Sequence, residues 1–315
     1  MRYSVQGYLA AVKLRGHSGR TVLVEGETDK RVLGRVSEEL GGRRPEKVYI
    51  DSADLIYVNP CMGNRDIVID VHSKAVGQLL KIAAFVDREF NKFTFLSDIK
   101  DEQPIHNVEQ TTLFWTRGHS IENYFFTCDR VSSFLRYRFS EKLPDRWESA
   151  IKANIVHVIQ WAAACSLSAS ENRCLTRMIG LIQVRHWIMN GAQIVLDVRQ
   201  FMSQLASRSI PDVTILAMES QATKNAVLLG KSPQLNLAQW VAHGHLGEEI
   251  LWSGVSYLIS TLGADPKLIN EITSGYCEEK LRHAADGWAP QVVVNAPETP
   301  SALVDWLIAS PCIMP

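Results

Sequence analysis

The sequence predicts an α/β domain over residues 1–127 and a mainly helical domain over residues 128–315. In the first region, short apolar runs alternate with helical patterns, as expected of a small doubly wound unit with a short, mostly parallel sheet flanked by helices. After Phe126 the apolar residues recur at helical spacing through long stretches. Long helices with an apolar face can bury against another protein, so we interpret the second region as a surface for partner docking or oligomerisation.

The elements of the first region follow from its apolar runs and turn residues. The run at 82–87 is almost continuously apolar, which is typical of a parallel strand buried on both faces. Gly41 and Gly42 end the helix that precedes the second strand. In chain order, the predicted elements are helix 4–14, strand 21–25, helix 28–40, strand 48–51, a helix within 66–80, and strands 82–87 and 113–116. In the second region we predict one extra strand at 211–218 and place Trp161 and Trp187 in helical patterns.

Composition limits the class of protein. A 46% apolar and 21% charged chain with net charge −1 is ordinary for a soluble globular protein and gives no global signal for nucleic acid. Six scattered cysteines form no CxxC pair, and we see no secretory signal, so we expect reduced thiols and a cytoplasmic protein. No segment approaches the roughly 20 uninterrupted apolar residues of a membrane span, so we expect no membrane association.

The first motif is the run Val24-Glu-Gly-Glu-Thr-Asp29. Glu25 ends a predicted strand, and in an α/β sheet the carboxyl ends of the strands form the edge where ligands bind. Asp29 lies one helical turn further on the same side, and Gly26 permits a sharp turn. Two acids presented this way favour a divalent-metal site, with Glu27 as an acid at the start of the helix.

The second motif is Val86-Asp-Arg-Glu89. Asp87 ends a buried strand and Glu89 follows two residues later, so both carboxylates can converge where the chain leaves the sheet. Mg²⁺ prefers oxygen ligands of this kind and usually retains several waters. The alternative, favoured when this motif is taken alone, is that Asp87 caps a helix and Glu89 is solvated. Together with Glu25, the pattern favours a metal site.

The third motif, His119-Ser-Ile-Glu-Asn-Tyr124, follows the predicted fourth strand. Glu122 is therefore expected near the same sheet edge, where Arg117 and His119 could contact a phosphate. An equally supported alternative is a helix start in which Ser120 is the N-cap and Glu122 an early helix acid.

Taken together, the three motifs resemble the Toprim-like nucleases related to the OLD (overcoming lysogenisation defect) family. More narrowly, they resemble the stand-alone Toprim nuclease subunits of the PARIS anti-phage systems, whose partner is an ABC-type ATPase. The run Trp240-Val-Ala-His-Gly-His-Leu246, followed by Leu251, resembles a further signature in the helical region of this family. The likeness is good over about 125 residues and loose over the rest of the chain.

The resemblance implies roles for the acidic residues. Glu25 matches the Toprim glutamate and Asp87 the first acid of the Asp-x-Asp motif. Glu89 stands where the family more often has Asp, which lengthens the ligand by one methylene. Asp29 and Glu122 match further acidic positions. The implied chemistry is phosphodiester hydrolysis assisted by Mg²⁺ or Mn²⁺, with Glu25, Asp87, Glu89 and Glu122 catalytic and Glu25, Asp29, Asp87 and Glu89 holding metal.

The resemblance also implies a biological setting. It favours RNA over DNA as the substrate, with transfer RNA as a candidate, and a toxic effector held in check by an ABC-type ATPase. Release followed by homodimerisation is the activation route we expect. The alternative is a non-catalytic Toprim-like subunit for assembly or nucleic-acid binding, and the Glu89 departure is the feature that favours it.

Basic residues are locally dense near the motifs, and we expect Lys30 and Arg31, with Arg117 and His119, to contact nucleic acid. An ordinary solvated helix face is an equally good interpretation of any one of them. The other basic residues near the first and third motifs are Arg15, Arg20, Arg35, Arg43, Arg44, Arg130, Arg136 and Arg138.

Two other motifs are set aside. Asn225-Ala-Val-Leu-Leu-Gly-Lys-Ser232 imitates a P-loop ending, but Asn225 replaces the first glycine and Pro233 interrupts the following helix. His243 and His245 could bind a transition metal, yet no cysteine or acid spacing completes a zinc site, so we expect a packing or partner role.

Overall fold

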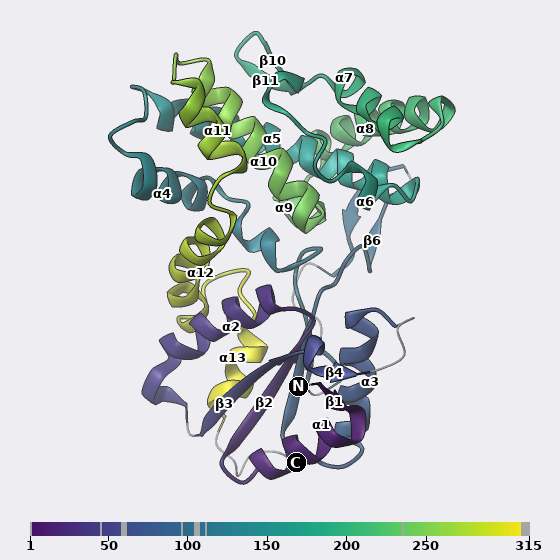
Figure 1. Cartoon of the computed structure of the whole chain (residues 1–315), viewed down its shortest axis with the longest axis vertical. Helices are drawn as coiled ribbons and strands as arrows, with labels where there is room; N and C mark the ends of the chain where they lie inside the picture. The colour runs from purple at the N-terminus through teal and green to yellow at the C-terminus, as the bar shows by residue number, and fades with distance from the viewer. Residues whose placement is uncertain are drawn as a thin grey trace. The chain divides into compact units, whose positions relative to one another are not determined.

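The computed structural model describes residues 2–44, 46–57, 62–95, 97–103, 108–110, 112–234 and 236–309 (Figure 1). The chain divides into two compact units. The first unit comprises Met1–Arg88, Gln103–Arg117 and Ala285–Pro315, and the second comprises Glu89–Glu102 and Gly118–Ala284. Each unit is therefore assembled from segments that are distant in the sequence.

A five-stranded sheet forms the centre of the first unit. Its strand order is β3 (Lys47–Ser52), β2 (Gly19–Val24), β5 (Ile82–Val86), β9 (Leu113–Trp115) and β8 (Val108–Gln110). The first four strands are parallel, and β8 is antiparallel to β9. Helices α1 (Val5–Arg15), α2 (Glu27–Leu40) and α3 (Asn64–Val76) flank the sheet (Figure 1). The predicted short, mostly parallel sheet flanked by helices is thus confirmed.

Strand alternation determines which residues fill the core. Ala84 and Val86 from β5, with Leu23 from β2, join residues of α1 and α3 such as Leu9 and Val68 in one buried cluster. All six residues of β2 are buried, as expected for a strand paired on both edges and covered on both faces. Short strands β1 (Tyr3–Ser4) and β4 (Ile56–Tyr57) form a separate parallel pair.

The C-terminal segment packs into the first unit through Arg20 on β2. The Arg20 guanidinium is fully buried, donates to Glu46 Oε1 from Nε at 2.8 Å, and donates to the backbone carbonyls of Trp306 and Ala309. It also lies over the Trp306 ring, 5.0 Å from the centroid. Helix α13 (Ser301–Ile308) is therefore held by a cation of the interior strand β2.

The second unit is mainly helical, and α5 (Trp147–Glu171) is its central element. It packs against α8 (Asp212–Lys231), α9 (Leu237–Val241) and α10 (Gly244–Ser260). The remaining elements are β6 (Phe93–Thr94), β7 (Lys100–Asp101), α4 (Cys128–Phe139), α6 (Leu175–Met178), β10 (Trp187–Asn190), β11 (Gln193–Leu196), α7 (Val198–Ser203), α11 (Pro266–Ser274), α12 (Cys277–Val293, which continues into the first unit), and 3-10 turns at 121–125, 184–186 and 204–208.

Three expectations from the sequence are corrected. Residues 211–218 do not form a strand, because Pro211 is the N-cap of α8 and Ile215, Met218 and Ala222 form a helical buried face. Trp187 belongs to β10, which pairs with β11 as an antiparallel hairpin, and not to a helix. The division between units also differs from a boundary at 127/128, since residues 118–127 belong to the second unit and the segment from Ala285 to the first.

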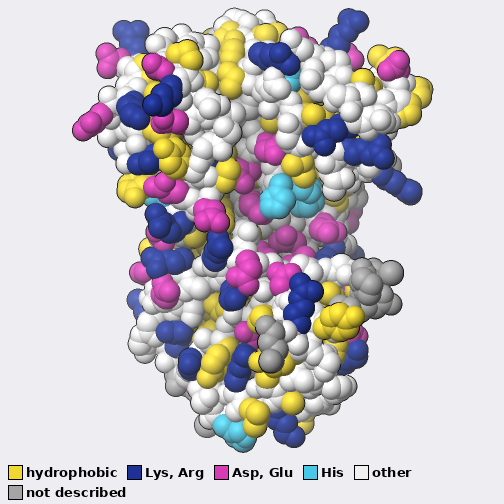
Figure 2. Space-filling view, viewed as in Figure 1, with side chains coloured by type: hydrophobic (Ala, Val, Ile, Leu, Met, Phe, Trp, Pro, Cys, Tyr) yellow, Lys and Arg dark blue, Asp and Glu magenta, His cyan; other side chains and the backbone are white. Residues whose placement is uncertain are grey.

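Among the described residues, we find no helix with the length and apolar character needed to cross a membrane. Acidic and basic side chains are interspersed over the face shown in Figure 2, in keeping with the net charge of −1.

We predict that Arg20→Met lowers the free energy of unfolding by about 3–5 kcal/mol, because it leaves buried hydrogen-bond acceptors without their cation. Urea unfolding followed by circular dichroism measures this change. The control is Arg43→Met, at an exposed position of the same unit. Equal stabilities for the two variants would contradict the anchoring role of Arg20.

Candidate functional site

Glu25 and Asp87 lie at the ends of two neighbouring parallel strands. Glu25 follows β2 and Asp87 follows β5, and Val24 is in register with Phe85. The Asp87 amide donates a hydrogen bond to Glu25 Oε1 at 2.7 Å. The Asn64 side chain donates to the Glu25 carbonyl at 3.0 Å, which ties the turn after β2 to the start of α3. The structure therefore brings these two acidic residues together at the carboxyl edge of the sheet.

The other acids of the first motif serve the start of α2. Asp29 is buried, and its Oδ2 accepts from the Gly26 amide at 3.0 Å, so one of its oxygens caps the helix. Glu27 Oε1 accepts from Lys30 Nζ at 3.1 Å and from Ser52 Oγ at 2.9 Å, and these bonds lower the pKa of the Glu27 carboxyl. Glu27 is thus an early helix acid, as expected.

Glu89 is exposed and has an unusual backbone conformation. Its φ is 54°, in the left-handed region that side chains other than glycine rarely adopt. Its amide donates to the His119 carbonyl at 2.7 Å, within the second unit. Such backbone strain costs about 1–3 kcal/mol and is concentrated at functional sites.

Arg88, between the two acids, was not among the predicted residues. Its side chain is buried, and Nη1 donates to the carbonyls of Arg117 and Gln103 at 2.8 and 2.9 Å. Its amide donates to Thr116 Oγ1 at 2.9 Å. Arg88 therefore joins the end of β5 to the end of β9. Its position between two acids suggests a surface cation, and nothing local in the sequence signals its burial.

The third motif is joined to the segment before α10 by buried hydrogen bonds. Asn123 Nδ2 donates to the carbonyls of Gln239 and Ala242 at 2.5 and 2.8 Å, and its Oδ1 accepts from the Ser120 amide. Gln239 Nε2 returns a bond to the Asn123 carbonyl at 2.8 Å. Residues 119–124 and 240–246, which resemblance alone had related, are thus neighbours in the second unit.

Gly244 allows this approach. A Cβ at Gly244 would lie 2.6 Å from Glu122 Oε2 and nearer still to Ser120 Oγ. With no side chain there, Glu122 Oε1 lies 3.7 Å from Nδ1 of His245 on the first turn of α10. The structure therefore pairs Glu122, which is buried, with an exposed imidazole.

His243 has a local structural role. Its Nδ1 accepts from the Leu246 amide at 3.3 Å and caps α10. Burial, with the neighbouring His245, lowers the pKa of His243 to about 4, so the ring is neutral at neutral pH. Its centroid lies 4.7 Å from that of His119, which in turn contacts Phe90 at 4.5 Å. This agrees with the expected packing role.

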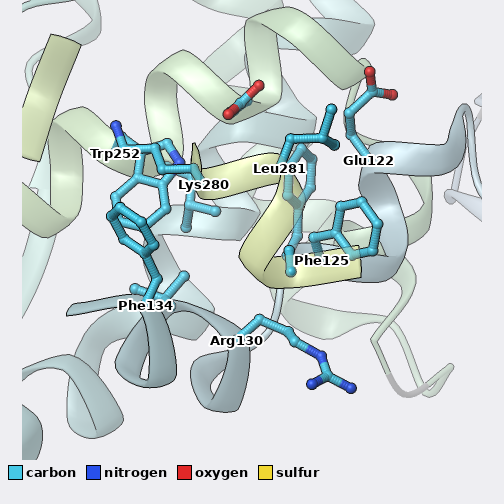
Figure 3. Close-up of a pocket in the computed structure, with 12 residues that line it drawn as sticks. Glu122, Phe125, Arg130, Phe134, Trp252, Lys280 and Leu281 are labelled. Atoms are coloured by element: carbon cyan, nitrogen blue, oxygen red, sulfur yellow. The ribbon is translucent and has the colours of Figure 1, made fainter. Parts of the chain in front are cut away.

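Glu122 also lines a small pocket between α4, α10 and α12 (Figure 3). The walls are mostly apolar, with Phe134 and Trp252 opposite Glu122. Lys280 Nζ lies 4.3 Å from the Trp252 ring centroid and donates to the Ile272 carbonyl at 2.7 Å. Burial lowers the pKa of Lys280 to about 8, while burial and the charge of Glu122 raise the pKa of Glu248 to about 6.

Most of the basic residues near the motifs have other partners. Arg15 pairs with Asp51 at 2.5 Å, Arg35 with Asp286 at 2.5 Å, and Arg20 is buried as described above. Arg117 is buried and pairs with Glu298, and His119 is buried as well. Contact of Arg117 and His119 with a phosphate therefore stays a prediction, at two side chains that the structure buries. Lys30 and Arg31, on α2, retain partial or full exposure.

The structure also shows the conformation of the P-loop-like run at 225–232. Residues up to Lys231 belong to the continuous helix α8, and Asn225 is buried on it. A phosphate cradle needs a glycine-rich loop ahead of a helix, so this segment is not one.

Across the described part of the chain, no three His, Cys, Asp or Glu side chains are grouped closely enough to hold a metal ion by themselves. Glu25 and Asp87 together offer carboxylate oxygens, and Mg²⁺ is commonly bound through one or two carboxylates plus water. The residues at this edge therefore suit a hard divalent cation.

Comparison with known proteins gives no match, either to a protein-family model or to a curated protein.

We predict that Gly244→Ala destabilises the protein by about 1–3 kcal/mol, since the new methyl group would overlap Ser120 and Glu122. The control is Gly34→Ala within α2, where an added Cβ has no atom within 4 Å and should stabilise by about 0.5–1 kcal/mol. Thermal unfolding distinguishes the two. A Gly244→Ala protein as stable as the wild type would show that Gly244 is not closely packed against Ser120 and Glu122.

We predict that Glu248→Gln is about 2 kcal/mol more stable than wild type at pH 7.5 and nearly equal to it at pH 4.5. The pKa of Glu248 is raised to about 6 in the folded state, so the folded protein binds more protons than the unfolded chain between about pH 4.5 and 6. Glu248 therefore lowers stability as the pH rises through this window. Urea unfolding at several pH values measures the difference, which should not vary with pH if Glu248 titrates normally.

Proposed function

We propose that this protein is a metal-dependent nuclease that hydrolyses nucleic-acid phosphodiesters. The observation that carries the proposal is the pair Glu25 and Asp87, at the ends of adjacent parallel strands and linked by the 2.7 Å hydrogen bond. In an α/β sheet this edge is the usual ligand site.

The chemistry of the donors supports Mg²⁺ or Mn²⁺. When bound, such an ion activates a water and neutralises the charge that develops on the phosphate. Glu25 and Asp87 would hold the ion through their carboxylates. The Asp87 amide donates to Glu25 Oε1 and so orients the Glu25 carboxylate at the end of its strand. Lys30 and Arg31, at the start of α2, supply nearby positive charge for a phosphate backbone.

Further residues enter the proposal through the motif resemblance. Glu89 and Glu122 stay predicted catalytic acids, and the strained φ of Glu89 supports a functional role for that residue. Asp29 stays a predicted metal ligand, with one oxygen already used by the helix cap.

The biological setting is also proposed from resemblance. RNA is the favoured substrate, with transfer RNA as a candidate, and an ABC-type ATPase of the same anti-phage system is the proposed restraining partner. The mainly helical second unit is the part of the chain that we propose contacts this partner.

We expect Glu25→Gln to lower the cleavage rate at least about 100-fold, since even residues that only support metal ligands change activity by 10–100-fold. The amide oxygen of Gln can still accept from Asp87, so the turn is preserved while the charge is lost. The assay uses the purified chain with RNA and DNA, with Mg²⁺, Mn²⁺ or EDTA.

The matched control is Glu27→Gln, which removes the same charge from the same turn at a residue bonded to Lys30 and Ser52. It should cleave at the wild-type rate. Wild-type cleavage by Glu25→Gln would refute the site. A wild-type chain that binds RNA but cleaves with none of these ions would favour the non-catalytic alternative.

A further inference from the structure

Helix α8 has two faces of different character. Ile215, Met218, Ala222 and Leu229 are buried, on the side where α8 packs against α5. The Met218 carbonyl also accepts a bond from Ser168 Oγ of α5 at 2.8 Å. This side of the helix is therefore fixed within the second unit.

The opposite face of α8 exposes large apolar side chains. Val213, Leu216 and Val227 are 74%, 64% and 49% exposed. Ser220 and Thr223 lie between them and are exposed as well. Single exposed apolar residues are common, but three along one helix face indicate an interaction surface.

The spacing of these residues is that of a coiled-coil seam. Positions 213, 216, 220, 223 and 227 alternate steps of three and four, so they occupy successive a and d positions. A surface hollow overlaps this stripe, and its lining includes Leu216, Ser220, Thr223 and Val227, together with Glu219, Lys224 and Leu228. Small side chains at the centre of the seam let a second helix approach closely.

We propose that α8 pairs in parallel with α8 of a second copy of this chain. The charges beside the seam favour this occupant. Glu219 precedes an a position and Lys224 follows a d position, which makes them g and e residues. In a parallel pair, a g residue meets the e residue five positions later on the other helix. Glu219 of each copy thus meets Lys224 of the other, and the two-fold axis forms this ion pair twice.

The same charges disfavour an antiparallel pair of these helices. In that arrangement g residues flank g residues, so the two Glu219 carboxylates would lie on the same side of the seam without Lys224 between them. Charged e and g residues set orientation in this way. The seam is short and its central residues are small, so the pair is a reversible one that depends on protein concentration.

The test is charge reversal, measured by sedimentation equilibrium from micromolar to submillimolar protein. Wild type should show a monomer–dimer equilibrium. Glu219→Lys and Lys224→Glu should each weaken the dimer at least about tenfold, because each creates two like-charge contacts. The double variant Glu219→Lys/Lys224→Glu should regain wild-type affinity. Lys224 also acts on the nearby Glu171 carboxyl within its own chain, an effect that the double variant would not repair.

The apolar seam is tested by Leu216→Asp, which should leave only monomer, with circular dichroism to verify folding. The control is Leu14→Asp, at a leucine of α1 that is 74% exposed. This variant should dimerise as the wild type does. A wild-type chain that stays monomeric throughout the range overturns the proposal. So does a folded Leu216→Asp protein that dimerises normally, or a double variant that dimerises no better than the single ones.

Discussion

Burial of the interior strand β2 on both faces and both edges is the constraint on which the first unit depends. Gly19 is required at its start, because a Cβ there would collide with the Lys47 carbonyl of the neighbouring strand. A strand enclosed in this way cannot slip in register without exposing apolar residues or losing hydrogen bonds. Because β2 ends at Val24, the next residue, Glu25, is held in a fixed position beside Asp87. The same enclosure explains how a cation can sit in the core, since Arg20 has Glu46 and two main-chain carbonyls as partners.

The second unit depends on satisfying buried polar groups around Asn123. This residue makes hydrogen bonds to Ser120, Gln239 and Ala242, and the reciprocal bond from Gln239 closes the network. Buried networks of this kind specify one arrangement, because each partner left unpaired would cost free energy. As a consequence, Glu122 is held close to the backbone of Gly244. The carboxylate of Glu122 lies 3.7 Å from the imidazole of His245, which is too far for a strong hydrogen bond.

Many basic residues lie near the motifs in the sequence, but several of them are already paired with carboxylates in the structure. Arg15, Arg20 and Arg35 are close to the first motif in the sequence, yet carboxylates of the first unit engage all three. The surface around Glu25 and Asp87 is therefore less basic than the sequence suggests. The exposed positive charge nearest this edge therefore comes from a few cations of α2, such as Lys30 and Arg31.

The sequence by itself determined the alternation of short strands and helices in the first unit and the placement of Glu25 and Asp87. Both follow from local patterns, because apolar runs bounded by turn residues form strands, and the carboxyl ends of parallel strands share one edge. It also determined that Glu27 is a helix-start acid.

Only the tertiary structure decided the burial of Arg20, Arg88 and Arg117, the helical state of residues 211–218, and the pairing of Glu122 with His245. The bond from Arg20 to Trp306 joins residues 286 positions apart. Such contacts leave no periodic trace, since burial of a charge depends on which partners the whole chain brings to it. Residues 211–218 are ambiguous for a related reason: a short apolar run suits a strand or a helix, and packing against α5 selected the helix.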